Sequence, residues 1–307
     1  MAEIPFAAPL DDVRYGVAEQ VSPLIRRVIA NNPGKYSYRG TGTYIVGHGD
    51  VAVIDPGPAL DEHREALTSA LAGERVRAIL ITHCHSDHSP LAAWLRETTG
   101  APTIAFGPHG AVDTTDDEES DVKVEESIDL AFVPDVRAVD GSLVACARGW
   151  TMRAVHTPGH TSNHLCFALD QEGALFTGDH VMGWSTTVVS PPDGDMRAYM
   201  HSLRKVAARH DRILWPTHGN PVTDPAPFLD AYLTHRLERE QQVLTQVRDG
   251  VASIEAMVKV LYANVREELH KPAGRSVLSH LVKLVDDELV IVDGGAAPSL
   301  KASFLPA

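Results

Sequence analysis

The sequence predicts an α/β layered domain followed by a smaller, mostly helical C-terminal domain that ends in a short hairpin. Through the first part of the chain, short β-branched runs alternate with helical patterns, as is typical of layered α/β domains. After "NPVTDPAP" long helical patterns replace this alternation. A length of 307 residues accommodates one large domain and a small partner. We therefore expect one domain over residues 1–224 and a second over residues 225–307.

Five short runs have the composition of buried strands, and each ends abruptly in a polar or glycine-rich loop. Continuous apolar runs of this length are typical of strands covered on both faces. They are "VAVIDPG" (Val51–Gly57), "RAILITH" (Arg77–His83), "MRAVHTPGH" (Met152–His160), "ALFTGDH" (Ala174–His180) and "RILWPTHG" (Arg212–Gly219). Side chains that follow such strands can be positioned by a rigid sheet.

Helices are predicted between the strands. After the second strand, Ser89 suits an N-cap, Pro90 suits the first helical position, and Gly100 ends the helix. The inward stripe of this helix is Leu91, Trp94 and Leu95. Tyr199 and Leu203 belong to a later helical stripe, which we expect in the core.

The C-terminal part reads as three helices and a hairpin. Pro227–Gly250 forms one long helical pattern, and "SIEAMVKVLY" (Ser253–Tyr262) forms a second. In Ser276–Gly295, a third helix is followed by a strand that ends at a double glycine. This is the outline of a small winged-helix-like domain.

Composition and charge limit the cellular setting and the partners. The start of the chain lacks the basic and apolar stretches of a signal peptide, and no run of about 18 apolar residues suggests a membrane span. Cys84, Cys146 and Cys166 form an odd, sparse set, which favours a reducing cytoplasm. The net charge of -14 argues against a protein that binds nucleic acid through bulk electrostatics. Much of the acid lies in Asp113–Asp129, which we interpret as a solvated loop.

The segment "HCHSDH" gathers four candidate metal ligands directly after a predicted strand. His83 and His85 are two apart and can face the same way from an extended segment. Asp87 and His88 are adjacent, so their side chains diverge and could serve a second metal. A single His-x-His would more often be a satisfied turn, but four candidate ligands in six residues favour a metal site.

Other strand ends supply further ligands. His160 lies in "TPGHTSNH", Asp179 in "TGDH" and His218 in "PTHGNP". A zinc ion needs about three or four nitrogen, oxygen or sulfur ligands. Seven protein ligands and a shared water would therefore complete two neighbouring ions.

These segments, in this order and spacing, resemble the metallo-β-lactamase superfamily of binuclear hydrolases over residues 40–222. The resemblance implies a four-layer αββα sandwich and assigns the ligands: His83, His85 and His160 to one ion, Asp87, His88 and His218 to the other, and Asp179 as a bridge. Asp55 in "IDPG" resembles the structural aspartate of the family, which supports the metal loops. The tail resembles the winged-helix extension of the lactamase-β-like branch, which includes single-strand endoribonucleases and thioesterases.

Two features depart from the family pattern. Ser89-Pro90 follows His88 where members often have glycine, which changes one wall of the pocket. Asp179 stands where one subclass of true lactamases has cysteine, and this argues against β-lactam hydrolysis as the native role, leaving it as a minor alternative.

The resemblance implies a dinuclear zinc hydrolase, and iron or manganese could occupy the same ligands. A hydroxide bridging the two ions would attack the substrate, with Asp87 and Asp179 as the catalytic carboxylates. We rank a small-molecule ester, thioester or lactone first as the substrate. RNA or another phosphodiester is the alternative, because the resembled branch includes ribonucleases. It ranks second, because the basic patch of the tail at His270, Lys271, Arg275 and Lys283 is thin and is followed at once by the acidic "VDDELV". The tail could instead shape the cleft or form a homo-oligomer interface.

Several residues near the motifs have two interpretations. His164 either bonds a substrate oxygen or stabilises its loop, and His180 is expected to support the site while pointing away from the metals. Trp184 is expected to line the cleft, where its face could hold an acyl group or a base, although packing is the default. Cys84 is expected to pack, and His156 to lie in the core or support the ligands. Histidines without ligand spacing are expected at the surface: His48, His63, His109, His210, His235, His270 and His280.

Overall fold

Two β-sheets pack face to face in the computed structural model, which describes residues 3–6, 9–110, 127–263 and 270–307. The first sheet holds its strands in chain order: β1 (Glu19–Gln20), β2 (Ile25–Ile29), β3 (Gly42–His48), β4 (Asp50–Ile54), β5 (Arg75–Leu80), β6 (Thr103–Ala105) and β7 (Val136–Arg137). The second holds, in spatial order, β12 (Ile213–Pro216), β11 (Ala174–Gly178), β10 (Leu165–Leu169), β9 (Trp150–His156) and β8 (Leu143–Ala147). Most of the acidic segment Asp113–Asp129 lies outside the described residues.

Strand direction changes within each sheet. The first sheet is antiparallel from β1 to β4 and parallel from β4 to β7. The second is antiparallel except where β11 pairs with β12. Parallel neighbours end at the same edge of their sheet, so the loops that follow them leave from that edge. The loops after β5 of the first sheet and after β11 and β12 of the second can therefore bring their side chains together.

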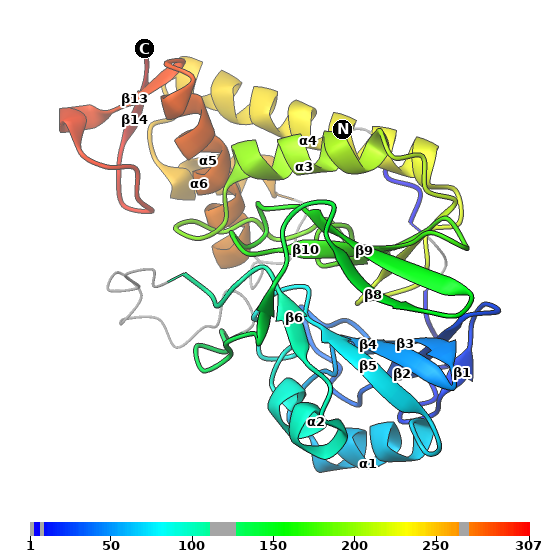
Figure 1. Cartoon of the computed structure of the whole chain (residues 1–307). Coiled ribbons are helices and arrows are strands. Elements are labelled where there is room, and N and C mark those ends of the chain that lie inside the picture. The colour runs from blue at the N-terminus through cyan, green and yellow to red at the C-terminus, as the bar shows by residue number, and fades with distance from the viewer. Residues whose placement is uncertain (1–2, 7–8, 111–126, 264–269) are drawn as a thin grey trace.

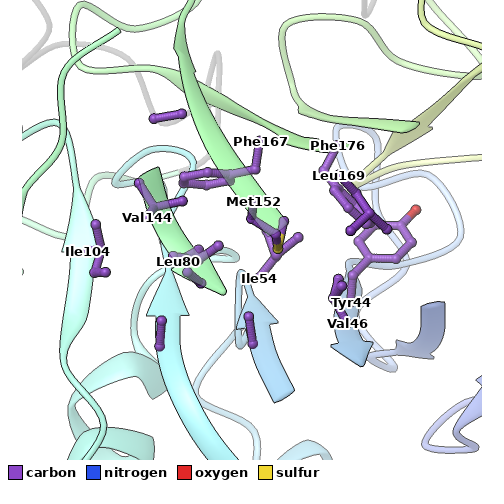
Figure 2. Close-up of a cluster of buried hydrophobic side chains, with 14 of the residues drawn as sticks. Tyr44, Val46, Ile54, Leu80, Ile104, Val144, Met152, Phe167, Leu169 and Phe176 are labelled. Atoms are coloured by element: carbon purple, nitrogen blue, oxygen red, sulfur yellow. The ribbon is translucent and has the colours of Figure 1, made fainter. Parts of the chain in front are cut away.

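The main hydrophobic core lies between the two sheets, and alternation along the strands explains it. Tyr44 and Val46 of β3 point into this core, whereas Ile45 between them points to the helices on the outer face. Figure 2 shows the inter-sheet side chains, with Phe167 and Phe176 of the second sheet above Leu80 and Ile54 of the first. Both faces of β3 and β4 are therefore covered, which accounts for their nearly continuous apolar sequence.

Helices cover the outer face of each sheet and complete four layers (Figure 1). Helices α1 (Asp61–Ala70) and α2 (Leu91–Thr99) lie on the first sheet, and α3 (Met196–Ala207) and α4 (Pro225–Arg248) lie on the second. Tyr199 and Leu203 of α3 are fully buried, as predicted. The expected αββα sandwich is confirmed.

The start of α2 differs from the prediction. Its N-cap position is Pro90 and no side chain caps it, because the hydroxyl of Ser89 instead donates to Asp129 at 2.7 Å. Gly100 ends the helix in the left-handed conformation, with φ of 70°, as predicted.

The C-terminal part has its own core around α5 (Ile254–Leu261) and α6 (His270–Asp286), with the hairpin β13 (Val290–Val292) and β14 (Phe304–Pro306). Within the described residues α6 runs from His270, six residues before the predicted Ser276, and so includes Pro272. The predicted boundary after residue 224 falls where α4 begins, but α4 packs into two cores. Phe228 near its start contacts the second sheet's cluster, and Val247 near its end contacts the C-terminal cluster.

Three histidines expected at the surface are buried, so that interpretation was wrong for them. His63 on α1 is 1% exposed and its Nε2 lies 3.0 Å from the Thr43 hydroxyl. His280 on α6 is 0% exposed, and His109 after β6 is 8% exposed. Within the described ranges, no helix is both long and apolar enough to span a lipid bilayer.

Candidate metal centre

Seven candidate ligands converge where strands of both sheets end. Four lie in "HCHSDH" after β5, and the others follow β9, β11 and β12. They are His83, His85, Asp87, His88, His160, Asp179 and His218, and all are buried. Their nitrogen and oxygen atoms form three overlapping groups that could each hold a metal ion, with the atoms of each group within 4.8 Å of one another.

The first group consists of His83, His85 and His160. His85 Nδ1 lies 2.9 Å from His83 Nε2 and 3.2 Å from His160 Nε2. Two nitrogens bound tetrahedrally to one zinc ion at about 2.0–2.1 Å lie roughly 3.3–3.4 Å apart. These three nitrogens therefore already have a spacing close to that of one face of a tetrahedral site.

The second group consists of Asp87, His88 and His218. Asp87 Oδ2 lies 3.2 Å from His218 Nε2, and Asp87 Oδ1 lies 3.4 Å from His88 Nε2. Asp179 stands between the two groups. Its Oδ1 is 3.4 Å from His218 Nε2, and its Oδ2 is 3.9 Å from Nε2 of His160 in the first group. One carboxylate oxygen thus faces each group.

Backbone carbonyls orient two of the histidines. His160 Nδ1 lies 2.7 Å from the carbonyl oxygen of Val188, and His218 Nδ1 lies 3.2 Å from that of Gly40. A carbonyl can only accept a hydrogen bond, so each Nδ1 carries the proton and each Nε2 presents its lone pair to the cluster. Such contacts behind the ligands are typical of metal sites.

Asp55 orients the histidines of the "HCHSDH" segment. It is fully buried with φ of 47°, a conformation that Asp and Asn tolerate better than most residues. One oxygen accepts from the Thr82 amide at 2.8 Å, and the other lies 2.7 Å from the Thr82 hydroxyl and 2.9 Å from His88 Nδ1. The same hydroxyl lies 3.0 Å from His83 Nδ1. A single carboxylate therefore fixes a histidine in each group.

Charge and unpaired atoms both indicate a place for cations. Asp87 Oδ1, Asp179 Oδ1 and His88 Nε2 are buried and make no hydrogen bond within the described part of the chain. Burial disfavours the charged form of His88, but Asp87, Asp179 and Asp55 raise its pKa to about 10. The three buried carboxylates therefore favour a positive charge beside His88 Nε2, and a bound divalent cation would provide that charge. The donor set fits the metals that the sequence implied.

A hydrogen bond to the ring of His164 fixes the backbone at Asp179. His164 is fully buried, with Nδ1 2.9 Å from the Thr157 hydroxyl, and Nε2 accepts from the Asp179 amide at 3.3 Å. Both ring nitrogens therefore contact the protein. Gly178 allows this approach, because a Cβ there would lie 2.7 Å from His164 Nε2.

Helix α4 holds the loop after Asp179 from the other side. The Tyr232 hydroxyl accepts from the Thr187 amide at 2.6 Å, and Arg236 donates to the Thr187 carbonyl. The Thr187 hydroxyl donates to the carbonyl of Asp179 at 2.8 Å. Because the next residue, Val188, carries the carbonyl that orients a ligand histidine, α4 supports the site through this loop.

Replacing Tyr232 by Phe is expected to lower the free energy of unfolding by about 1–3 kcal/mol, because the buried Thr187 amide loses its acceptor. Chemical denaturation of the variant and the wild type measures this difference. Tyr15→Phe, at a ring that is 36% exposed, provides the control and should change stability little. Equal stability of Tyr232→Phe and wild type would show that the hydroxyl does not hold the loop.

A cleft of about 430 Å³ opens beside the candidate ligands. His85, His160 and Asp179 line it, together with Trp184 and residues of the C-terminal domain. Trp184 stacks on Tyr38 with ring centroids 4.7 Å apart. The volume lies within the range of small-molecule sites.

The remaining predicted residues lie around the site. His180 is buried beside Tyr199, with ring centroids 5.0 Å apart, and burial lowers its pKa to about 3. Cys84 is buried and packed, as predicted. His156 is half-buried and stacks on Phe106 at 4.1 Å, so it lies neither in the core nor against the ligands.

Sequence reasoning did not identify four residues that support this site. Thr82 precedes His83 directly, and its position in the ligand motif could have indicated its role. Thr41, directly before β3, donates to Asp87 Oδ2 at 2.9 Å, and Tyr232 and Arg236 act from α4. No local pattern marks these three.

Family models match both parts of the chain. Residues 39–218 match the metallo-beta-lactamase superfamily, and residues 253–297 match the beta-lactamase associated winged helix domain. The first match contains all seven candidate ligands.

Curated relatives match over most of their length. The chain is 30% identical to the lactamase-like protein ptaB of Pestalotiopsis fici over 92% of this chain and 85% of the relative. It is 31% identical to an atrochrysone carboxyl ACP thioesterase of Aspergillus chevalieri over 92% and 86%. It is 33% identical to the atrochrysone carboxyl ACP thioesterase AgnL7 of Paecilomyces divaricatus over 91% and 83%.

Solved structures share the fold across both domains. A beta-lactamase domain protein from Burkholderia ambifaria superposes with a TM-score of 0.78 at 21% identity, covering 97% of this chain and 96% of the other. A metallo-beta-lactamase family protein from Thermus thermophilus gives a TM-score of 0.69 at 22% identity, covering 94% and 100%. The chain is a hydrolase that belongs to the metallo-beta-lactamase superfamily and carries the winged helix domain associated with it.

Proposed function

We propose that the protein is a dinuclear zinc-dependent hydrolase of small-molecule acyl thioesters. The observation that carries the proposal is the position of two neighbouring ligand groups, with Asp179 between them, beside an apolar cleft that His85, His160 and Asp179 line. His83, His85 and His160 would hold one ion, Asp87, His88 and His218 the other, and Asp179 would contact both. Two relatives that match nearly the whole chain are named as thioesterases, which supports this substrate class over other esters and lactones.

The chain's own residues position the reaction. Two bound zinc ions would supply a water of lowered pKa and polarise the substrate carbonyl. The Thr41 hydroxyl donates to Asp87 Oδ2 at 2.9 Å, whereas Oδ1 makes no hydrogen bond within the described part of the chain and could accept one from the attacking water. A thiol has an ordinary pKa near 8.5, so the departing thiolate needs no general acid.

Iron or manganese would fit the same nitrogen and oxygen donors, since geometry and supply decide which metal binds. Three histidines in the first group favour zinc over magnesium or calcium, which prefer oxygen ligands. β-Lactam hydrolysis remains a minor alternative, and the assembly state remains a prediction.

The alternative substrate, single-stranded RNA, receives less support from the C-terminal domain. Of the four basic residues in its patch, Lys283 pairs with Glu240 at 2.9 Å and with Asp287 at 2.8 Å. Arg275 is 8% exposed and donates to the Pro191 carbonyl at 3.3 Å. A surface that follows a phosphate backbone needs several available cations. These two are committed to protein partners.

A substrate panel is expected to separate these functions. Acyl thioesters of N-acetylcysteamine, a lactone, a cephalosporin and unstructured RNA are compared, and thioesters should be hydrolysed fastest. Treatment with a strong chelator should abolish turnover, and added zinc should restore it. Because Cys146 is exposed, thiol release is measured against an enzyme blank without substrate.

Rapid RNA cleavage that the chelator abolishes, with negligible thioester turnover, would replace the proposed function by the nuclease. Full activity with one bound ion per chain would contradict the dinuclear site.

A further inference from the structure

We propose that the C-terminal domain forms part of the acyl-binding pocket, and that Ser276 and Tyr262 set the size of the acyl group that is accepted. This inference rests on the proposed thioesterase function. The cleft at the candidate ligands is also lined by residues from α6 and from the end of α5: Tyr262, Pro272, Ala273 and Ser276. One cavity therefore runs from the reacting centre to the second domain.

Between the candidate ligands and the C-terminal domain, the lining of the cleft is suited to an apolar group. Met182, Trp184 and Val188 contribute apolar surface beside His160. Among the described lining residues the cations are Lys35 and Arg236, and Arg236 donates to the Thr187 carbonyl. A thiol leaving group of the pantetheine type carries two amides, whose burial against apolar side chains is costly. The acyl group is the part of a thioester that this surface stabilises.

The acyl group must also be connected to the reacting carbon. Because His85, His160 and Asp179 line the same cleft, a carbonyl held at the ligands leaves its acyl chain in the adjoining space. The C-terminal side chains then lie where the length or width of that chain is sensed.

Side-chain size on this wall supports the assignment of Ser276. Ala273 and Ser276 are three residues apart on α6, so both small side chains can face the cleft together. The opposite side of α6 is anchored, with Val277 and Leu281 fully buried in the C-terminal core. A larger side chain at Ser276, which is only half-buried, would extend into the cleft without displacing this core.

Tyr262 occupies space on the same wall. Its ring lies 4.3 Å from the Arg239 guanidinium, which also donates to the Leu261 carbonyl at 3.2 Å. This contact fixes the ring at the end of α5. Truncation to alanine would enlarge the cleft, so the two positions predict opposite changes in selectivity.

The test measures kcat and KM for acetyl, butyryl, hexanoyl and octanoyl thioesters with Ser276→Phe, Tyr262→Ala and wild type. Each buried methylene favours binding by roughly fourfold, so exclusion of two or three should raise KM for octanoyl by about tenfold or more in Ser276→Phe. The loss in kcat/KM should be smallest for acetyl and should grow with acyl length, because acetyl extends least from the reacting centre. Tyr262→Ala should shift the preference toward longer or wider groups.

Val260→Phe is the matched control, because Val260 lies on α5 in the same domain, is 57% exposed and does not line the cleft. Thermal unfolding verifies that each variant folds. A uniform loss for all acyl lengths, or identical behaviour of Ser276→Phe and Val260→Phe, would overturn the inference.

A binding measurement distinguishes failure of the proposed thioesterase function from failure of the pocket inference. If wild type hydrolyses no thioester, the proposed function is wrong, and calorimetric titration with octanoate then tests the pocket alone. Binding by wild type and Val260→Phe that is lost in Ser276→Phe supports the pocket. Absence of octanoate binding to wild type refutes it.

Discussion

Replacing Asp179 by Ala is expected to reduce thioester hydrolysis by several hundredfold or more and to release metal. Its carboxylate lies 3.4 Å from His218 and 3.9 Å from His160, so it is the side chain that would be shared by both ions. Loss of a residue that only supports a ligand typically costs about 10–100-fold, and loss of a shared ligand should exceed this. Turnover and elemental analysis of the purified variant measure both effects.

Cys84→Ala is the matched control for this variant, because Cys84 stands between two candidate ligands in sequence. Its sulfur lies 3.1 Å from the Asn163 amide nitrogen, and burial raises the pKa of its thiol to about 11. It is therefore a packed thiol rather than a thiolate ligand, and its replacement should change activity only a few-fold. Equal losses from the two substitutions would mean that the ligands are misassigned.

The fold and the candidate ligands could be predicted because their signals are local. His83, His160 and His218 each follow an apolar run, and a polar ligand type directly after a strand is visible without knowing the tertiary structure. The order of strands then brings these ends together.

The misassigned histidines show where a local pattern was overlooked. His63 lies four residues before Leu67 on α1, and His280 lies three after Val277 on α6, so both fall on the buried faces of their helices. The absence of ligand spacing does not by itself place a histidine at the surface. His109, after β6, has no such helical pattern, so its burial depends on distant packing.

The sequence allowed that the tail shapes the cleft, but it did not indicate which of its residues line the cleft, nor the support that Thr41, Tyr232 and Thr187 give to the site. Tyr232 and Thr187 are 45 residues apart, and Thr41 and Asp87 are 46 apart. Ser276 reaches the cleft only because α6 packs against α3 and α4. Such contacts depend on how elements pack, and a single sequence does not encode that packing in any local pattern.

The second large effect is expected at Asp55, where one atom determines the protonation of two candidate ligands. The Thr82 hydroxyl donates to Asp55 and so accepts from His83 Nδ1, while His88 Nδ1 donates to the same carboxylate oxygen. Both histidines therefore carry their proton on Nδ1, and Nε2 is left as the metal ligand.

Asp55→Asn preserves the shape and the tolerance for φ of 47° but exchanges that oxygen for an NH₂ donor. The remaining oxygen must still accept from the Thr82 amide, so the NH₂ faces His88 and the Thr82 hydroxyl. His88 Nδ1 must then accept, and the hydroxyl turns to donate to His83. In both rings the proton moves to Nε2, which blocks one ligand in each group. We expect Asp55→Asn to unfold near the wild-type temperature but to bind zinc about 10–100-fold more weakly or worse.

Comparison with Asp55→Ala distinguishes the effect of Asp55 on the orientation of the ligand histidines from its effect on the stability of the fold. The alanine variant leaves the buried Thr82 amide without an acceptor and places alanine in the left-handed region, so unfolding free energy should fall by about 2–5 kcal/mol as well. Competition titration against a chelator measures zinc affinity, and chemical denaturation of the metal-free proteins measures stability. Wild-type zinc affinity in a folded Asp55→Asn variant would refute the tautomer argument, since this variant loses both the acceptor pattern and the negative charge of Asp55.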